Sequence, residues 1–362
     1  MSATLSSTRL FSAVRFGAVE AANRVVMAPL TRLRAELDGT PNALMVEQYR
    51  QRAGVGMIVA EGTWPVIEGR TWYGQPGIAT AEHVVGWRKV TDAVHAEGGR
   101  IALQIMHGGR ISHPEITGTG RIVAPSAVAA PNPIRISTGK VDAPLPHALS
   151  VEEIDGVVAD FVAAAERAMD AGFDAVQIHG ANGYLIHQFF SPSSNLRSDE
   201  YGGTPERRAR LGIEVTRAVA AAIGADRTGI RVSPEHNVQG AVEQDHDDVA
   251  AAYRHFAESV ADLGLSHIDV LHAEPGSELV QSIRSASRAP LIANTGFAEI
   301  TTLEEAARLV GEDVAAAVSV GRAVIANPDL VRRWETGAAL NEPRPETFYT
   351  GGARGYTDYP SL

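Results

Sequence analysis

The sequence of 362 residues contains no cysteine, which excludes disulfide bonds, thiolate zinc sites and iron–sulfur clusters. Long apolar runs are also missing: no stretch approaches the roughly 18 apolar residues of a membrane span, and the beginning, MSATLSSTRLFSAVRF, lacks the apolar core of a secretory signal. We therefore expect a cytoplasmic protein without a membrane partner. Basic residues are outnumbered by acidic ones, 32 to 43, and form no block, so we expect no nucleic-acid partner.

A G-x-G-x-x-G fingerprint is absent where the first helix should begin, which argues against a doubly wound dinucleotide-binding sheet. The chain instead alternates short apolar segments with helix-compatible sequence. Eight apolar segments begin near residues 24, 57, 100, 175, 229, 267, 290 and 316. Eight βα units predict an α/β fold of the TIM (β/α)8 barrel type, with its active site at the C-terminal strand ends. Barrels of this size are routinely single domains, so we expect residues 1–362 to form one domain.

Two segments depart from this alternation. Residues 11–19 alternate around Gly17 like a small hairpin ahead of the first strand. Residues 108–149, after the third strand, contain six prolines, too many for a helix, and residues 134–141 read as a second hairpin. We interpret residues 108–149 as an insertion that lies over the barrel mouth as a lid, with a passive surface excursion as the alternative.

The most informative stretch is AVQIHGANGYLIHQFFSPSSNLRSDEYGG, residues 175–203. A short apolar strand ends there in polar groups, because His179, Asn182 and Tyr184 follow within six residues. An imidazole and a carboxamide can both donate hydrogen bonds to one oxyanion, and a nearby phenol can give up a proton. Taken singly, the three residues are a core histidine, a turn residue and a packing aromatic. Their arrival together at one strand end favours a catalytic role.

The other predicted strand ends carry groups that suit a large, flat heteroaromatic ligand with a phosphate. Gln104 can pair both a donor and an acceptor with a ring imide, and Arg231 can hold negative charge on a reduced ring. Thr295-Gly296 and Gly321-Arg322 follow the seventh and eighth strands, where this fold often binds phosphate through backbone amides at a helix N-terminus.

Several motifs together resemble the Old Yellow Enzyme family of FMN-dependent ene-reductases, or NADPH dehydrogenases. The resemblance covers nearly the whole chain, and its most specific block is IHGANGYLIHQFFSPSSNLRSDEYGG at 178–203. The other matching motifs are NRVVMAPLTR at 23–32, AEGT at 60–63, LQIMHGGRISH at 103–113, RVSP at 231–234, GRAVIANPDL at 321–330 and GYTDYP at 355–360.

The resemblance implies bound FMN, NADPH or NADH as reductant, and an activated alkene as substrate, an α,β-unsaturated carbonyl or nitro compound that receives hydride from flavin N5 at its β-carbon. His179 and Asn182 would hydrogen-bond the electron-withdrawing oxygen of the substrate, and Tyr184 would protonate its α-carbon. The residues implied around the flavin ring are Pro29, Thr31, Gly62, Gln104 and Arg231, and those implied near its phosphate are Thr295, Gly296, Ser319, Gly321 and Arg322.

Three further residues are implied as parts of the substrate pocket. Met106 stands where many family members have tryptophan, and Trp72 falls near a position often held by tyrosine, so both should reshape the pocket. Tyr356, in the C-terminal motif, is either a pocket wall or a packing residue. Thr31 stands where one subgroup of the family has cysteine, which places the chain closer to the other subgroup.

Some polar groups outside this set need no ligand. His236 and residues 245–248 resemble a metal cluster, but acidic residues in a first helical turn need no metal, so we expect no metal site. Two other functions stay open: a metal-assisted barrel hydrolase or aldolase that uses His179 and His187, and a flavoprotein that binds FMN without turnover. A monomer and a homo-oligomer are both compatible with the sequence.

Overall fold

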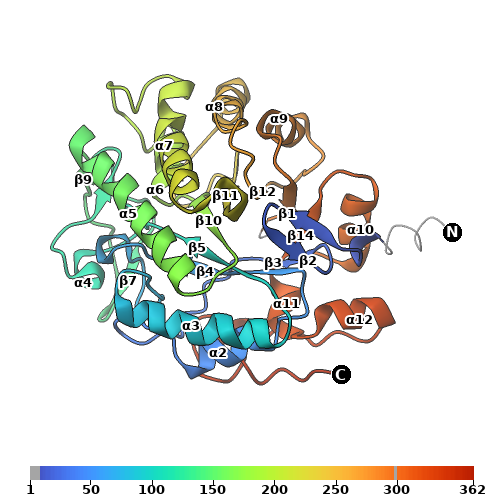
Figure 1. The fold of residues 1–362 in the computed structure, drawn as a ribbon. Helices are drawn as coiled ribbons and strands as arrows, with labels where there is room; N and C mark the ends of the chain where they lie inside the picture. The colour runs from blue at the N-terminus through green and yellow to red at the C-terminus, as the bar shows by residue number, and fades with distance from the viewer. Residues whose placement is uncertain (1–8, 297–299) are drawn as a thin grey trace.

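The structure, a computed structural model, describes residues 9–296 and 300–362 and confirms the predicted barrel (Figure 1). Eight parallel strands close on themselves, because β14 pairs with β3 as well as with β13. Their carboxyl ends therefore meet at one mouth. In chain order the barrel strands are β3 (Val25–Met27), β4 (Met57–Thr63), β5 (Ile101–Ile105), β10 (Ala175–Gly180), β11 (Thr228–Val232), β12 (His267–Leu271), β13 (Leu291–Asn294) and β14 (Ala317–Val320).

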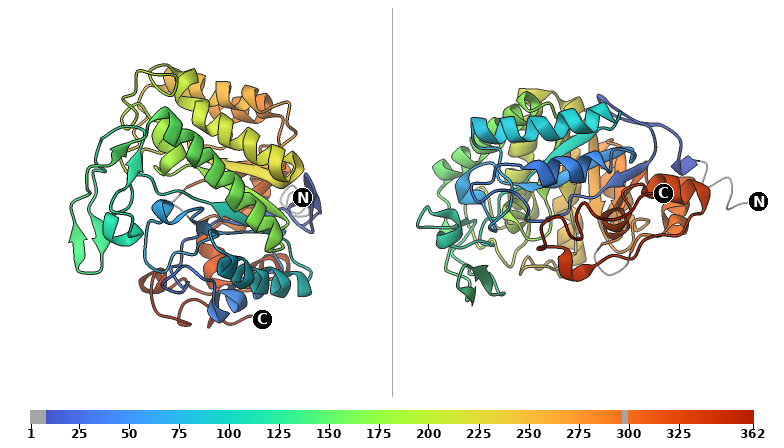
Figure 2. Two further views of the ribbon diagram at one scale, coloured as in Figure 1. Left: turned by 60° about the vertical axis from the view of Figure 1, so that its left-hand side comes forward. Right: turned by 90° about the horizontal axis from the view of Figure 1, so that it is seen from below.

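A ring of helices surrounds these strands (Figures 1 and 2). The main helices after successive barrel strands are α2 (Ala43–Arg50), α3 (Ala81–Ala96), α5 (Val151–Asp170), α7 (Pro205–Ile223), α8 (His246–Ser259), α9 (Glu278–Ser287), α10 (Leu303–Gly311) and α12 (Leu330–Thr336). Shorter helices are α4 (Pro114–Thr117), α6 (Leu185–Phe190) and α11 (Arg322–Ala326), and single 3-10 turns occupy Ile67–Gly69, Ala225–Arg227 and Pro345–Thr347. None of the described helices is both long enough and apolar enough to span a bilayer.

Local sequence signals place the helix starts. Ser150 and Glu153 form a capping box at the start of α5, with Glu153 N donating to Ser150 Oγ (3.1 Å) and Ser150 N donating to Glu153 Oε2 (2.8 Å). Thr204 caps α7 ahead of its proline. The side chain of Asp245 caps α8 by accepting hydrogen bonds from two backbone amides in the first turn, Asp247 N and Asp248 N. The acidic run at 245–248 is therefore a helix start.

Each long helix buries one apolar stripe against the barrel. In α5 the stripe consists of Ile154, Val157, Phe161, Ala165 and Ala168, which recur at helical spacing and are all buried in the main core. Full burial of one large apolar side chain stabilises the fold by about 1.5–3 kcal/mol, so the stripe fixes the rotation of the helix on the barrel.

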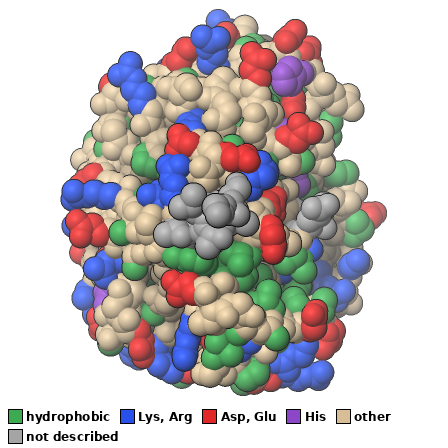
Figure 3. Space-filling view, turned by 90° about the vertical axis from the view of Figure 1, so that its right-hand side faces the viewer, with side chains coloured by type: hydrophobic (Ala, Val, Ile, Leu, Met, Phe, Trp, Pro, Cys, Tyr) green, Lys and Arg blue, Asp and Glu red, His purple; other side chains and the backbone are tan. Residues whose placement is uncertain are grey.

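The N-terminal hairpin closes the end of the barrel opposite the mouth. Strands β1 (Val14–Phe16) and β2 (Val19–Ala21) pair antiparallel, and Ala18 N donates to Asp226 O (2.8 Å). Phe16 and Val19 are buried in a cluster with inward residues of the barrel strands. Figure 3 looks onto this end, where acidic and basic side chains are interspersed around a hydrophobic area.

The insertion after β5 lies at the other end of the molecule, far from the N-terminal hairpin in every view (Figures 1 and 2). It contains β6 (Val123–Ala124) paired with β9 (His147–Ala148), and an antiparallel hairpin of β7 (Ile134–Ile136) and β8 (Gly139–Val141). Ile134 and Ile136 pack in one apolar cluster with Met106 and Tyr184. The insertion is thus anchored over residues of the barrel mouth.

Candidate active site

The turn after β10 presents Asn182 in a strained but well-supported backbone conformation. Asn182 has φ +56°, in the left-handed region that asparagine tolerates better than most residues. Asn182 N donates to Ser233 Oγ (2.9 Å), and Gln239 Nε2 donates to Asn182 O (2.7 Å). The turn is therefore held through the backbone, and Asn182 Oδ1 has no hydrogen-bond partner among the described residues.

His179, at the end of β10, is a neutral imidazole. It is buried, and its Nδ1 has no hydrogen-bond partner within the described part of the chain. Burial is the main cause that lowers the pKa of His179 well below its ordinary value of 6.5, and the positive field of Arg231 acts in the same direction. A neutral ring has one N–H to donate, and it stays neutral at physiological pH.

Tyr184 is packed edge-on against its neighbours. Its ring centroid lies 5.0 Å from that of His179 and 6.1 Å from that of Trp72. Burial raises the pKa of Tyr184 above its ordinary value of 10, although a hydrogen bond with Gln239 acts in the opposite direction. The phenol therefore keeps its proton throughout the physiological range.

An apolar cluster forms a wall beside Tyr184. It includes Met106 and, packed against it, Trp72, the two residues that the sequence marked as reshaping a pocket. Ile134 and Ile136 of the insertion belong to the same cluster. The phenol is therefore flanked by apolar groups from the β4–β5 connection, from the residue directly after β5 and from the insertion.

A hydrogen-bonded network crosses the inside of the barrel just below the mouth. Gln104 Nε2 donates to Gln177 Oε1 (2.8 Å), and Gln177 Nε2 donates to Asp269 Oδ2 (3.3 Å). The same Asp269 oxygen accepts from Arg231 NH1 at 2.6 Å. A Cβ added to Gly62 would lie 2.7 Å from Met106 Sδ and 3.4 Å from Gln104 Oε1, so a larger residue at this position would press on both side chains. Gln104 and Arg231 of this network were predicted from the sequence, whereas Asp269 was not.

The ends of β13 and β14 carry the groups predicted for a phosphate. Asn294 Nδ2 donates to Ser319 O (2.8 Å), and Gly296 N donates to Asn294 Oδ1 (3.0 Å), so the two strand ends are tied together. Thr295 Oγ1 and Ser319 Oγ are buried without partners among the described residues. Residues 321–322 follow directly at the start of α11.

Unpartnered polar atoms gather around the mouth, which is unusual because buried polar groups are normally hydrogen-bonded. Among the described residues they include His179 Nδ1, Asn182 Oδ1, Arg231 Nε, Thr295 Oγ1 and Ser319 Oγ, from β10, β11, β13 and β14 or the turns after them. Pro29 and Thr31, after β3, lie partly buried at the same end. Donors and acceptors on one side and hydroxyls on the other fit a flavin ring with a phosphate tail.

Tyr356, expected from the sequence to be either a pocket wall or a packing residue, is packed inside the protein. The ring is fully buried between the Arg32 and Arg34 guanidinium groups, 5.0 and 4.9 Å from its centroid, which is the packing alternative rather than a pocket wall. Tyr349, which the sequence did not single out, is 63% exposed and lies close enough to Tyr184 to raise the pKa of that phenol. Its signal was only an aromatic residue in a Gly-rich C-terminal segment.

Part of the specific block at 178–203 braces the site. His187 Nδ1 accepts from Gly183 N (2.8 Å), and its Nε2 lies 3.3 Å from Oε1 of the buried Glu243. Asn195 Nδ2 donates to two backbone carbonyls that flank the turn after α6. His187 is thus directed into the core, and the described residues contain no group of three potential His, Asp or Glu metal ligands.

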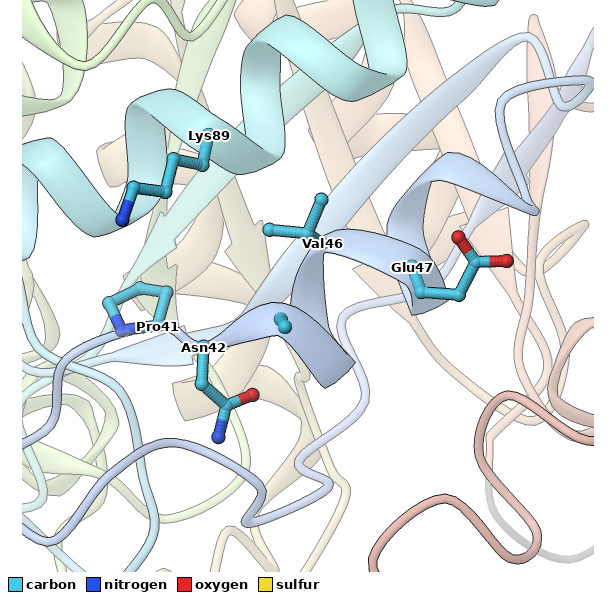
Figure 4. A pocket seen from close by; sticks show the side chains of 6 residues that line it. Pro41, Asn42, Val46, Glu47 and Lys89 are labelled. Atoms are coloured by element: carbon cyan, nitrogen blue, oxygen red, sulfur yellow. The ribbon is translucent and has the colours of Figure 1, made fainter.

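A separate hollow lies between α2 and α3 (Figure 4). No predicted site residue contributes to it. It is lined by Pro41, Asn42, Ala43, Val46, Glu47 and Lys89.

Comparisons with known proteins agree with this geometry. A "probable flavin mononucleotide-dependent alkene reductase" of Leishmania infantum is 44% identical over 349 residues, 94% of each chain. The solved structure of the old yellow enzyme homologue from Zymomonas mobilis is 41% identical with a TM-score of 0.92, covering 98% of this chain and 99% of that one. Morphinone reductase in complex with tetrahydroNAD is 39% identical with a TM-score of 0.91, covering 98% and 97%. Residues 9–341 match the NADH:flavin oxidoreductase / NADH oxidase family. The chain therefore belongs to this family, the Old Yellow Enzyme family, and is an FMN-dependent oxidoreductase.

Proposed function

We propose that the enzyme reduces the activated C=C bond of α,β-unsaturated carbonyl or nitro compounds, with NADPH or NADH as reductant, as a single FMN-binding barrel domain. The observation that carries the proposal is the set of His179, Asn182 and Tyr184. The imidazole of His179 and the side-chain amide of Asn182 both have unused hydrogen-bonding capacity, and both lie near the Tyr184 phenol, which keeps its proton. This combination serves a reaction that builds negative charge on an oxygen and then needs a proton on carbon.

His179 and Asn182 hold the substrate oxygen in this proposal. Negative charge grows on that oxygen as the β-carbon is reduced, so two fixed donors stabilise the transition state more than the neutral substrate. A neutral His179 donates without adding a full positive charge. The turn that holds Asn182 is fixed by its backbone, which leaves its side-chain amide available to the ligand.

Tyr184 supplies the proton to the α-carbon. Its high pKa makes it a weak acid, yet it is adequate towards a carbanionic centre held within reach. Trp72 and Met106 limit the width of the substrate space, and the insertion at 108–149 excludes water from it.

The residues that would hold FMN are those already set out at the strand ends. Gln104 and Arg231 would meet the polar edge of the ring, beside Pro29, Thr31 and Gly62. Thr295, Gly296, Ser319 and residues 321–322 would meet the phosphate. Bound FMN supplies the hydride for the β-carbon after reduction by the nicotinamide.

Purified protein decides between this function and its alternatives. We expect a yellow protein that NADPH or NADH bleaches without oxygen and that a cyclic enone, nitroalkene or maleimide restores to yellow. A colourless protein that takes up no flavin and shows metal-dependent hydrolysis or aldol cleavage would favour the barrel hydrolase or aldolase. A yellow protein that nicotinamides cannot bleach would favour FMN binding without turnover.

A further inference from the structure

A buried ion pair lies directly behind the proposed flavin site. Arg231 NH1 and Asp269 Oδ2 are 2.6 Å apart, and both side chains are almost completely buried. Arg231 Nε has no partner among the described residues, so the guanidinium has one unused donor. A buried ion pair usually adds little to the stability of a fold, because the desolvation of two charges offsets most of their attraction. Its position invites a functional explanation.

The same carboxylate orients Gln104. Gln177 Nε2 faces two acceptors, Asp269 Oδ2 (3.3 Å) and His267 Nε2 (3.1 Å). Gln177 must therefore turn its oxygen to Gln104 Nε2, which leaves Gln104 Oε1 without a donor from this network and able to accept from a ligand.

The barrel makes room for this network at one glycine. A Cβ on Gly229 would lie 2.2 Å from His267 Cε1, so only glycine lets the imidazole lie inside the barrel. His267 is neutral because burial lowers its pKa to about 4. Its Nδ1 lies 3.0 Å from Ser266 Oγ, which lets Nε2 act as the acceptor for Gln177.

Asp269 differs from an ordinary packing residue because its negative charge compensates the positive charge of Arg231. Arg231 carries one positive charge and Asp269 one negative charge, while His179 and His267 are neutral. Burial raises the pKa of Asp269, and the pull of Arg231 opposes that rise. A ring bound above this pair faces a nearly balanced pair of charges, and removal of the carboxylate would leave Arg231 uncompensated.

We propose that Asp269 is a positioning residue that fixes Arg231 and, through Gln177, Gln104, and whose charge lowers the reduction potential of the bound flavin. The proposal rests on FMN binding at the proposed site. Because reduction adds negative charge to the flavin, an uncompensated Arg231 favours the reduced form. Loss of the Asp269 charge therefore raises the reduction potential of the flavin. Loss of a residue with only a structural role would not shift the potential specifically upwards.

The test measures the potential of the FMN-loaded protein against a reference dye, together with the dissociation constant of FMN. Asp269→Asn keeps the side-chain shape and an oxygen for Arg231. We expect FMN to stay bound and the two-electron reduction equilibrium to move at least tenfold towards the reduced flavin, about 30 mV upwards. Asp269→Glu retains the charge, so its flavin should have a potential closer to that of the parent protein than the flavin of Asp269→Asn.

A matched control is Asp248→Asn. The partly exposed Asp248 pairs with the buried Arg208 between α7 and α8, away from the barrel interior, so we expect an unchanged potential. An unchanged or lower potential in FMN-loaded Asp269→Asn overturns the proposal.

Two outcomes at the level of folding and binding are also decisive. Asp269→Ser is a second variant without the charge, and failure of both variants to fold would show a structural role and overturn the proposal. Absence of FMN from the parent protein would overturn the proposed function itself, a result distinct from bound FMN with an unmoved potential.

Discussion

Replacement of Tyr184 by phenylalanine removes one hydroxyl and little else. The ring would keep its edge contacts with His179 and Trp72 and its place in the apolar cluster. The hydroxyl's hydrogen bond with Gln239 is lost, which changes the free energy of unfolding by only about 1 kcal/mol. FMN binding and reduction by NADPH should therefore persist.

The Tyr184→Phe substitution should instead slow the step in which the alkene is reduced. A positioned general acid contributes about 10²–10⁴-fold, which corresponds to about 3–5 kcal/mol of barrier. Tyr184 is 8% exposed and lies under apolar side chains, so water is poorly placed to replace it. Anaerobic stopped-flow absorbance separates the two steps: bleaching by NADPH should match the parent protein, and recovery with a cyclic enone should slow by at least about 10²-fold. Because the pKa of Tyr184 is raised, the parent rate should not fall as pH rises through 10, the ordinary tyrosine value.

Tyr201→Phe is the matched control. Tyr201 OH donates to Glu214 Oε2 (2.8 Å) outside the barrel mouth, so this variant should lose about 1 kcal/mol of stability and keep both half-reactions. Unchanged enone turnover in Tyr184→Phe, or an equal loss in the Tyr201 variant, would refute the assignment of Tyr184 as proton donor.

Three further predictions follow from the same structure. Combined His179→Ala and Asn182→Ala substitution should leave FMN bound while weakening phenolic ligands by about 2–5 kcal/mol, as absorbance titration would show; parent-like affinity would contradict the oxygen-binding role. Gly229→Ala should destabilise the fold by at least about 1–3 kcal/mol, because its Cβ would overlap His267. Gly156→Ala, on the exposed face of α5 with no atom near the added Cβ, should stabilise the fold by about 0.5–1 kcal/mol; equal melting temperatures of the two variants would contradict this reasoning. The pKa of buried His267 falls from 6.5 to about 4, so its contribution to stability is present above pH 6.5 and is lost as pH falls towards 4; His267→Gln should flatten that acid limb of thermal unfolding, and a slope equal to that of the parent would contradict the reasoning.

Much of the architecture could be predicted because its signals are local. The apolar segments and the capping residues at 150–153, 204 and 245 predict strands and helix starts from neighbours in the chain. The barrel then follows from eight repeats, and barrel geometry brings the strand ends together. His179, Asn182 and Tyr184 were recognisable for the same reason, since they lie within six residues at one strand end.

The sequence by itself thus determined the barrel, its mouth and the residue types placed there. Only the tertiary structure decided which partners those residues have: Asp269 meets Gln177 from 92 positions away, and Tyr356 lies between two arginines more than 300 positions earlier. A carboxylate within a short apolar strand, or a tyrosine in a C-terminal motif, carries no sign of its partner in its neighbours. Hydrogen bonds and charge compensation act through space over a few ångströms, so these roles exist only once the barrel has closed.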